Sequence, residues 1–268
     1  MPALLYEKRD GVAYLTFNRP EVHNAWNPEL FCRLADAWAD FAEDGSLRVA
    51  IITGAGDKAF AVGADLATFI PLVTRARQPE DDWDRRVLED LTLTDPAVLR
   101  NYPLYKPVIA AVNGFCLAGG TELLQGTDIR IAAEHATFGL SESKRALVPG
   151  GGSMVRLARQ IPYCKAMEIL LTGDRISAEE AYRIGLVNYV VPAAEVMPLA
   201  EQFARKLAAN GPLALRAIKE AVIRTSGLPL EEAYKIESKL SRQVFLSEDA
   251  REGPRAFMEK REPRYTGR

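Results

Sequence analysis

The sequence is poor in the side chains that bind transition metals or form disulfides. Only two histidines, His23 and His135, and three cysteines occur among 268 residues. Neither histidine has a cysteine or carboxylate at the spacing of a metal site, so we expect no bound metal. Cys32, Cys116 and Cys164 are odd in number and widely spaced, which predicts reduced thiols in the core rather than a disulfide framework.

Charge and hydropathy do not favour a nucleic acid or a membrane as a partner. The net charge is only −2, so no long-range field would attract a nucleic acid or an anionic membrane. Any anion-binding site must therefore be local. No apolar run reaches the ~18 residues of a membrane span, and the first residues, MPALLYEKRDG, do not resemble a signal peptide. We therefore expect a soluble, cytoplasmic protein. With 48% hydrophobic residues, the chain can bury a substantial core.

Strand-like and helix-like segments alternate along the first two thirds of the chain. Residues 12–17, 49–53 and 108–112 have the composition of buried strands. A helix is expected after Asn27 and Pro28, an N-cap followed by a first-turn proline. This alternation favours an α/β fold with crossover connections. Short helices joined by irregular chain are expected over 67–105, and from Glu195 onward only helices are expected.

The most informative stretch is VIAAVNGFCLAGGTELLQG, from Val108 to Gly126. After the predicted strand, Gly119 and Gly120 open a segment whose backbone N–H groups are not covered by a side chain. Glu122 follows about one helical turn after Gly119. Because the first N–H groups of a helix lack internal partners, they can donate to a developing negative charge. This pattern predicts an oxyanion site with a carboxylate beside it.

A second stretch, KAFAVGADL from Lys58 to Leu66, contains the sequence Gly63-Ala64-Asp65. Taken alone, these residues indicate no more than a turn that enters a helix, with Asp65 as an acid of its first turn. The nearby GAG sequence at 54–56 lacks the remaining residues of a dinucleotide-binding fingerprint or a P-loop. The second stretch gains its significance from the first.

Together with ATFGLSESKRALVPGGG, which begins at Ala136, these stretches resemble the crotonase superfamily, and within it the enoyl-CoA hydratases. The resemblance extends from NRPEVHNA near the start to REGPRAFMEKREPRYTGR at the end. It implies an α/β fold with a crotonase-like spiral of ββα units over residues 1–194 and a C-terminal helical trimerisation region over 195–268. A homo-oligomer, either a trimer or a dimer of trimers, is the expected assembly.

The resemblance also implies a reaction. In the matching enzymes, the N–H groups of Ala64 and Gly119 bind the thioester oxygen of a coenzyme A ester. Glu122 and Glu142 take the positions of two carboxylates that add water to a 2-enoyl-CoA, giving a 3-hydroxyacyl-CoA. We expect Glu142 to donate the proton to carbon and Glu122 to activate the water, although the pair would titrate as a unit. The implied protein is a carbon-oxygen lyase of fatty acid metabolism. It needs no cofactor, since coenzyme A is part of the substrate.

Further residues are implied to contact the coenzyme A ester. At the C-terminal end, Phe257 and Lys260 match residues that contact the adenine and phosphates, often across a subunit boundary, although a solvated basic tail is the simpler interpretation of this end. His23 and Trp26 are treated as structural. The full set expected to contact the substrate comprises Ala61, Ala64, Asp65, Leu66, Gly119, Phe257 and Lys260.

Some residues depart from the usual hydratase pattern. Ala118 stands where the first of three glycines is common, and Thr121 stands where cysteine is frequent. After Glu142, the segment SKRALVPGGG is more basic and less regular than the usual lysine-leucine-glycine-leucine pattern. We expect Lys144 and Arg145 to be solvated rather than to alter the rim of the pocket. These departures concern the substrate more than the superfamily.

Three functions remain open from the sequence. The first is an enoyl-CoA hydratase. The second is another crotonase-fold reaction, such as an enoyl-CoA isomerase, a hydroxyacyl-CoA dehydratase or a lyase, because all of these stabilise a thioester enolate. The third is a non-catalytic subunit that binds CoA esters. This last alternative predicts the loss of a glutamate or of Gly119, and both glutamates and Gly119 are present.

Overall fold

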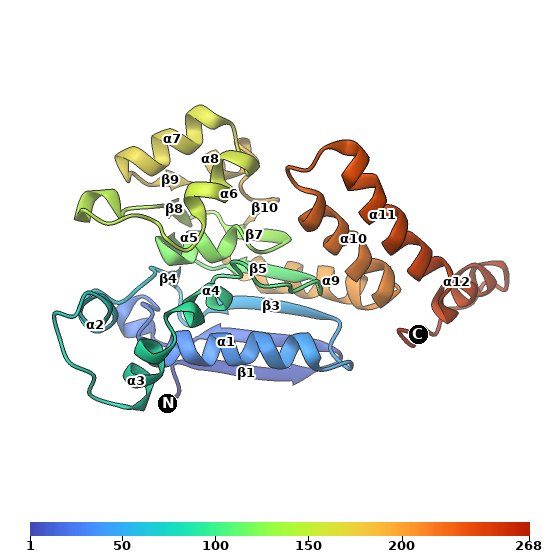
Figure 1. Ribbon diagram of the computed structural model, residues 1–268, viewed down its shortest axis with the longest axis horizontal. Coiled ribbons are helices and arrows are strands. Elements are labelled where there is room, and N and C mark those ends of the chain that lie inside the picture. The colour runs from blue at the N-terminus through green and yellow to red at the C-terminus, as the bar shows by residue number, and fades with distance from the viewer.

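The computed structural model describes residues 1–268 and contains two β-sheets. The larger sheet has six strands in the order β1-β2-β3-β5-β7-β10 (Figure 1). Strands β1 and β2 form an antiparallel hairpin, and the remaining neighbours are parallel. The strands are β1 (Leu4–Arg9), β2 (Val12–Phe17), β3 (Val49–Gly54), β5 (Val108–Val112), β7 (Ile129–Ala133) and β10 (Tyr189–Val191).

The smaller sheet has four short strands in the order β4-β6-β8-β9. They are β4 (Ala59–Ala61), β6 (Phe115–Leu117), β8 (Thr137–Gly139) and β9 (Ile176–Ser177). Along the chain, β3, β5 and β7 of the larger sheet are each followed by a strand of the smaller sheet and then by a helix. This repeated passage is the spiral of ββα units, so the predicted α/β fold class is confirmed.

The core lies around β5, whose residues are all fully buried. Burial on both faces explains why this strand is an unbroken apolar run. Helix α1 (Pro28–Glu43) packs on β1 and β2 and begins where expected, because the Asn27 side chain accepts a hydrogen bond of 3.0 Å from the Leu30 amide. The large apolar side chains of α1, including Trp38 and Phe41, are fully buried.

Short helices cover residues 69–97, as the sequence predicts. They are α2 (Phe69–Val73), α3 (Asp82–Glu89), the 3₁₀ turn η2 (Leu91–Leu93) and α4 (Thr94–Ala97). Beyond β6 the chain forms α5 (Gly119–Leu124), and beyond β8 it forms η3 (Ser143–Arg145), α6 (Ser153–Gln160), α7 (Tyr163–Thr172) and α8 (Ala178–Arg183). Because α5 begins at Gly119, its first amides lie at the end of β6.

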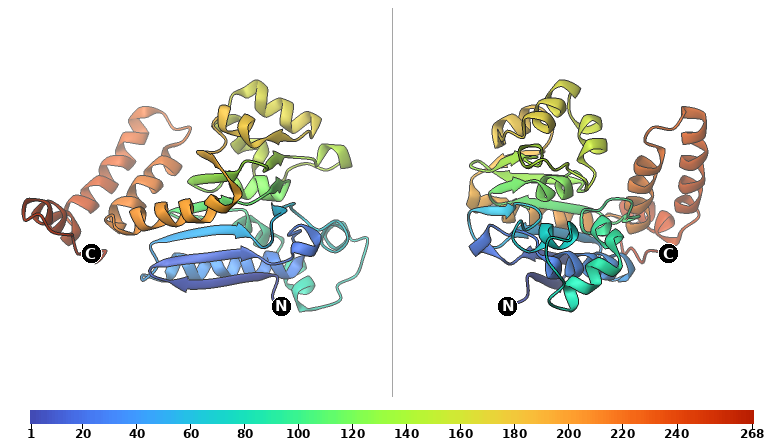
Figure 2. Two further views of the ribbon diagram at one scale, coloured as in Figure 1. Left: turned by 180° about the vertical axis from the view of Figure 1, so that it is seen from behind. Right: turned by 60° about the vertical axis from the view of Figure 1, so that its left-hand side comes forward.

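The C-terminal part is helical. Helix α9 (Val196–Ala208) packs against β3, β5 and β7 and so belongs to the core. Helices α10 (Pro212–Thr225), α11 (Leu230–Phe245) and α12 (Glu248–Met258) project away from the two sheets (Figures 1 and 2). Their role in trimerisation, and a division of the chain at residue 194, stay predictions. None of the helices is both long and apolar enough to span a membrane.

The prediction of three core thiols is wrong for one cysteine. Cys32 and Cys116 are buried, whereas Cys164 is exposed. In α7 the buried positions are Ala166 and Ile169. Cys164 lies two residues before Ala166, about 200° away around the helix, and therefore faces solvent.

Candidate active site

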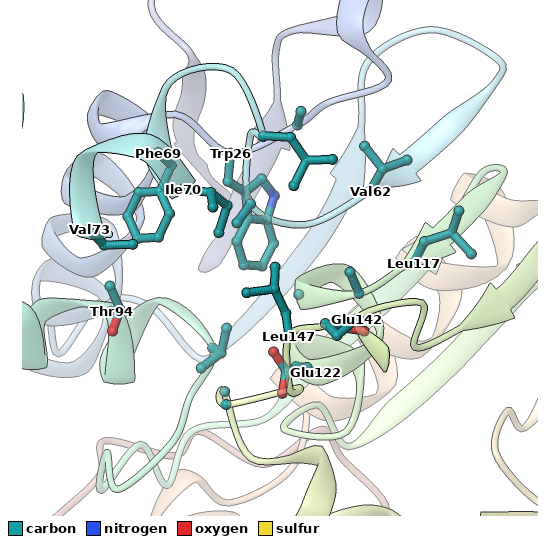
Figure 3. A pocket seen from close by; sticks show the side chains of 18 of the residues that line it. Trp26, Val62, Phe69, Ile70, Val73, Thr94, Leu117, Glu122, Glu142 and Leu147 are labelled. Carbon is teal, nitrogen blue, oxygen red and sulfur yellow. The ribbon is translucent and has the colours of Figure 1, made fainter. Parts of the chain in front are cut away.

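A cavity of about 620 Å³ lies beside the start of α5. Five of the residues expected in the site line it: Ala64, Leu66, Gly119, Glu122 and Glu142. Most of the other lining side chains are apolar. In Figure 3 the two glutamates lie at one side of the cavity, and the apolar residues of α2 lie across it. The structure thus brings the two motifs and both acids to one place.

Two backbone amides at the cavity have no partner within the protein. The Trp26 amide donates to the Gly63 carbonyl (2.8 Å), and the Asp65 amide donates to the Trp26 carbonyl (2.9 Å). This bridge leaves the Ala64 N–H between them unpaired, and the Gly119 N–H is also unpaired. The two segments touch, because a Cβ added to Gly63 would lie 2.5 Å from the Gly119 nitrogen. An anionic oxygen in this cavity would therefore meet two free donors.

Asp65 does not line the cavity but anchors the segment that does. Its carboxylate accepts hydrogen bonds from the Arg19 guanidinium (2.8 Å) and from the amides of Ala67 (2.9 Å) and Thr68 (3.2 Å). Burial alone would raise the pKa of Asp65, but these donors outweigh it and hold the pKa below its usual value. The ion pair and the two amide bonds therefore hold Asp65, the residue directly after Ala64, in place.

Ala61 also lies outside the cavity, although it was expected to contact the substrate. It is fully buried in β4, and its carbonyl oxygen lies against Gly120, where an added Cβ would approach it to 2.5 Å. Only glycine permits this close contact between β4 and the first turn of α5.

Ala118, the residue before Gly119, has a backbone conformation that favours glycine. Its φ is +49° and its ψ is −124°. The conformation is held from both sides, because the Ala118 amide donates to the Gly139 carbonyl (2.9 Å) and its carbonyl accepts from the Glu122 amide (3.0 Å). Such strain costs on the order of 1–3 kcal/mol and is frequent at functional sites. The Ala118 side chain lines the cavity.

Glu122 is a carboxyl group in an apolar setting, with only 6% of its surface exposed. Its Oε1 accepts a hydrogen bond of 3.3 Å from the Ser153 amide at the start of α6. Gly151 lies so close that an added Cβ would be 2.7 Å from Glu122 Oε2. Burial, reinforced by the charge of Glu142, raises the pKa of Glu122 to about 7. Near neutral pH this group can therefore either hold or release a proton.

Glu142 stands at the start of the turn η3. Its Oε2 atom is buried and has no hydrogen-bond partner in the protein. Burial raises the pKa of Glu142 above its usual value. The cavity thus contains two carboxyl groups whose pKa values are both raised. In Glu142, the Oε2 atom is free to form a hydrogen bond with a ligand.

The sequence analysis missed part of the cavity wall. Trp26 was treated as structural, but it lines the cavity, and its indole Nε1 is buried without a partner. Phe31 also lines the wall and stacks on Phe69 with ring centroids 4.2 Å apart. Trp26 lies edge-on to Phe31 at 5.4 Å. The position of Trp26 shortly after the Asn-Arg-Pro turn at residues 18–20 was the only signal in the sequence.

The two basic residues after Glu142 behave differently from one another. Lys144 forms an ion pair with Asp174 and is exposed, as expected. Arg145, which was also expected to be solvated, lines the cavity. Arg145 is thus exposed, as expected, but the expectation that it lies away from the pocket rim is wrong.

Phe257 and Lys260 lie outside the cavity of this chain. Phe257 is 82% exposed on α12, and Lys260 follows two residues after that helix ends. Helix α12 belongs to the part of the chain that projects away from the two sheets (Figure 2). The contact of Phe257 and Lys260 with coenzyme A stays a prediction.

No group of three or more histidine, cysteine or acidic side chains is arranged to hold a metal ion. Residues 7–268 match the family model described as enoyl-CoA hydratase/isomerase. The chain belongs to this family. The match spans both motifs, both cavity glutamates and the projecting helices, so the site described above is that of an enoyl-CoA hydratase/isomerase family member.

Relatives with known names agree with this assignment. Enoyl-CoA hydratase EchA19 of Mycobacterium tuberculosis is 44% identical, and the alignment covers 100% of this chain and 97% of the relative. Carnitinyl-CoA dehydratase of Salmonella paratyphi A is 40% identical, with 100% of both chains covered. The crystal structure of enoyl-CoA hydratase from Bacillus anthracis superposes with a TM-score of 0.89 at 37% identity, covering 99% of this chain and 100% of that one.

Proposed function

We propose that this enoyl-CoA hydratase family member adds water reversibly across the 2,3 double bond of a 2-enoyl-CoA, giving a 3-hydroxyacyl-CoA. The observation that carries the proposal is the presence of two buried carboxyl groups in the cavity that also holds two unpaired amide donors. Hydration needs these parts together: an acid, a base and a site for the thioester oxygen. The free amides of Ala64 and Gly119 serve as the oxyanion hole.

In the proposed mechanism Glu122 acts on the water and Glu142 on carbon. The backbone N–H bond to Glu122 stabilises its charged form, which suits a base that deprotonates water for attack at C3. Oε2 of Glu142 has no such donor, which suits the acid that protonates C2. Burial raises the pKa of both carboxyl groups, so this division of roles rests on the hydrogen bond and on the resemblance, and not on a difference in pKa. Charge that develops between the two steps passes to the thioester oxygen and its two amide donors.

The coenzyme A portion of the substrate would extend from the oxyanion hole past Leu66 at the cavity mouth. Leu66 is 54% exposed although it lines the cavity. We assign the adenine and phosphates to Phe257 and Lys260 of another copy in a homotrimer or a dimer of trimers. The exposed apolar side chains of α10 and α11, among them Ile218 and Val222, support such an assembly. No further cofactor is needed for this chemistry.

The test is the loss of the conjugated enoyl-thioester absorbance when the purified protein is mixed with crotonyl-CoA. Glu122→Gln and Glu142→Gln should each lower kcat by 100-fold or more, in the order of about 10²–10⁴ that general acid–base catalysis contributes. Both variants should still bind the ester. Glu134→Gln is the control, since Glu134 is an exposed acid that does not line the cavity. Full activity in either cavity variant would remove that carboxylate from the mechanism.

A second candidate is the dehydration of a hydroxyacyl-CoA. The full-length relative named carnitinyl-CoA dehydratase favours it. Because dehydration is the reverse of hydration, the same two carboxyl groups would serve. Faster turnover of a 3-hydroxyacyl-CoA than of any enoyl-CoA would favour this direction of the reaction.

A further inference from the structure

Arg145 is a cation at the cavity that has no acidic partner. It lines the cavity, and its only side-chain hydrogen bond runs from Nη1 to the Ser141 carbonyl (3.1 Å). The other guanidinium N–H groups donate to nothing in the protein. The adjacent Lys144, by contrast, is paired with Asp174 and does not line the cavity. Of these two neighbouring cations, only Arg145 is available to a ligand in the cavity.

The local backbone directs Arg145 to the same side as Glu142. The Arg145 amide donates to the Glu142 carbonyl (2.9 Å) in the 3₁₀ turn η3. In a 3₁₀ helix, side chains three residues apart project in the same direction. Their proximity also appears in the pKa of Glu142, which burial raises and the charge of Arg145 partly lowers. A group bound by Arg145 would therefore lie beside the reacting part of an acyl chain.

The other charged residues of the cavity do not neutralise Arg145. Asp95 lines the cavity but is paired with Arg100 at 3.3 Å. Arg175 adds a second positive charge, and its guanidinium stacks over the Phe115 ring at 5.1 Å. Apart from the two glutamates, which the proposed reaction uses, the charged lining consists of two arginines and one aspartate that is already paired, set within an apolar wall.

We propose that Arg145 forms an anion subsite for a free carboxylate on the acyl group, so that the substrate class is the 2-enoyl-CoA monoesters of dicarboxylic acids. This inference rests on the proposed function of the same site. Guanidinium groups bind carboxylates through paired N–H donors, and hydrogen bonds to charged groups are stronger than neutral ones. The aromatic wall of Trp26, Phe31 and Phe69 would take the apolar part of the same acyl group.

The test compares two series of 2-enoyl-CoA esters of matched chain length, one ending in a carboxylate and the other in a methyl group. The wild type should show the higher kcat/KM for a carboxylated ester. Arg145→Leu should lose about tenfold or more on that ester and change less than about threefold on its methyl counterpart. Arg145→Lys should keep part of the preference, because it retains the charge. Lys144→Leu, the matched control, should leave the preference intact.

Binding of the saturated carboxylated and methyl esters, measured by calorimetry, separates this inference from the proposed reaction. A wild type that prefers the carboxylated ester in binding, but hydrates neither series, would overturn the reaction and keep the subsite. Hydration with no preference in any chain length would overturn the subsite and keep the reaction. Equal weakening of both series and of free coenzyme A by Arg145→Leu would assign the arginine to the coenzyme A phosphates and overturn the inference.

Discussion

Replacing Glu122 by glutamine should change how the stability of the protein depends on pH. Glutamine keeps the shape of the side chain and an oxygen that accepts from the Ser153 amide, but it cannot ionise. Glu122 has a pKa of about 7 in the folded protein against 4.5 as its ordinary value. Its ionisation is thus harder in the folded state than in the unfolded chain.

The sign and size of this effect on the free energy of unfolding follow from the two pKa values of Glu122. Below pH 4.5 the carboxyl is protonated in both states and contributes nothing. Between pH 4.5 and 7 the folded state binds more protons, so stability falls as pH rises, and the full penalty is present above pH 7. At 1.36 kcal/mol for each pH unit between the two values, the penalty is about 3 kcal/mol. The Glu122→Gln variant should lack it.

The assay is urea unfolding at several pH values between 4 and 8. Over this pH range, the free energy of unfolding of the wild type should fall by about 3 kcal/mol more than that of Glu122→Gln. Glu142→Gln should shift the wild-type fall toward lower pH, because it removes a charge that raises the pKa of Glu122. Parallel pH curves for the wild type and Glu122→Gln would refute the reasoning, since they would mean that Glu122 ionises as easily in the folded protein as in the unfolded chain.

Three further predictions concern the backbone of the site. Asp65→Asn breaks the buried ion pair with Arg19, so it should lower the free energy of unfolding in urea by about 3 kcal/mol. It should also lower kcat more than it raises KM, and an unchanged kcat would contradict the anchoring role of Asp65. Gly120→Ala should cost on the order of 1–3 kcal/mol, because its Cβ meets the Ala61 carbonyl, and an unchanged Tm would contradict the close contact. Ala118→Gly relieves a φ of +49° and should gain about 1 kcal/mol by calorimetry after the entropic cost of glycine; a lower Tm would speak against strain there.

Elements whose signals are local could be predicted from the sequence. The buried strand at 108–112 follows from its unbroken apolar run, and the start of α1 follows from Asn27 and the proline after it. Glycines at 119 and 120, with an acid one turn later, indicated a helix start open to an anion, and the structure places Gly119 and Glu122 in one cavity. These features depend on few long-range contacts.

Features that depend on partners distant in sequence could not be predicted. The strands at 59–61 and 115–117 have three residues each, too short to show a period, and they exist because they pair with each other. The role of Trp26 in holding the Ala64 segment depends on a bridge between two loops. Arg145 borders the cavity because η3 is a 3₁₀ turn, whereas its sequence resembles a solvated basic segment.

Mass spectrometry of the acyl-CoA product formed in isotopically labelled water tests the central claim most directly. If the two cavity carboxyl groups hydrate a 2-enoyl-CoA, the product should be heavier than the substrate by one molecule of water and should carry the labelled oxygen on its acyl group. A product of unchanged mass would show isomerisation, and a shortened acyl-CoA would show cleavage; either result would contradict hydration as the reaction of this site.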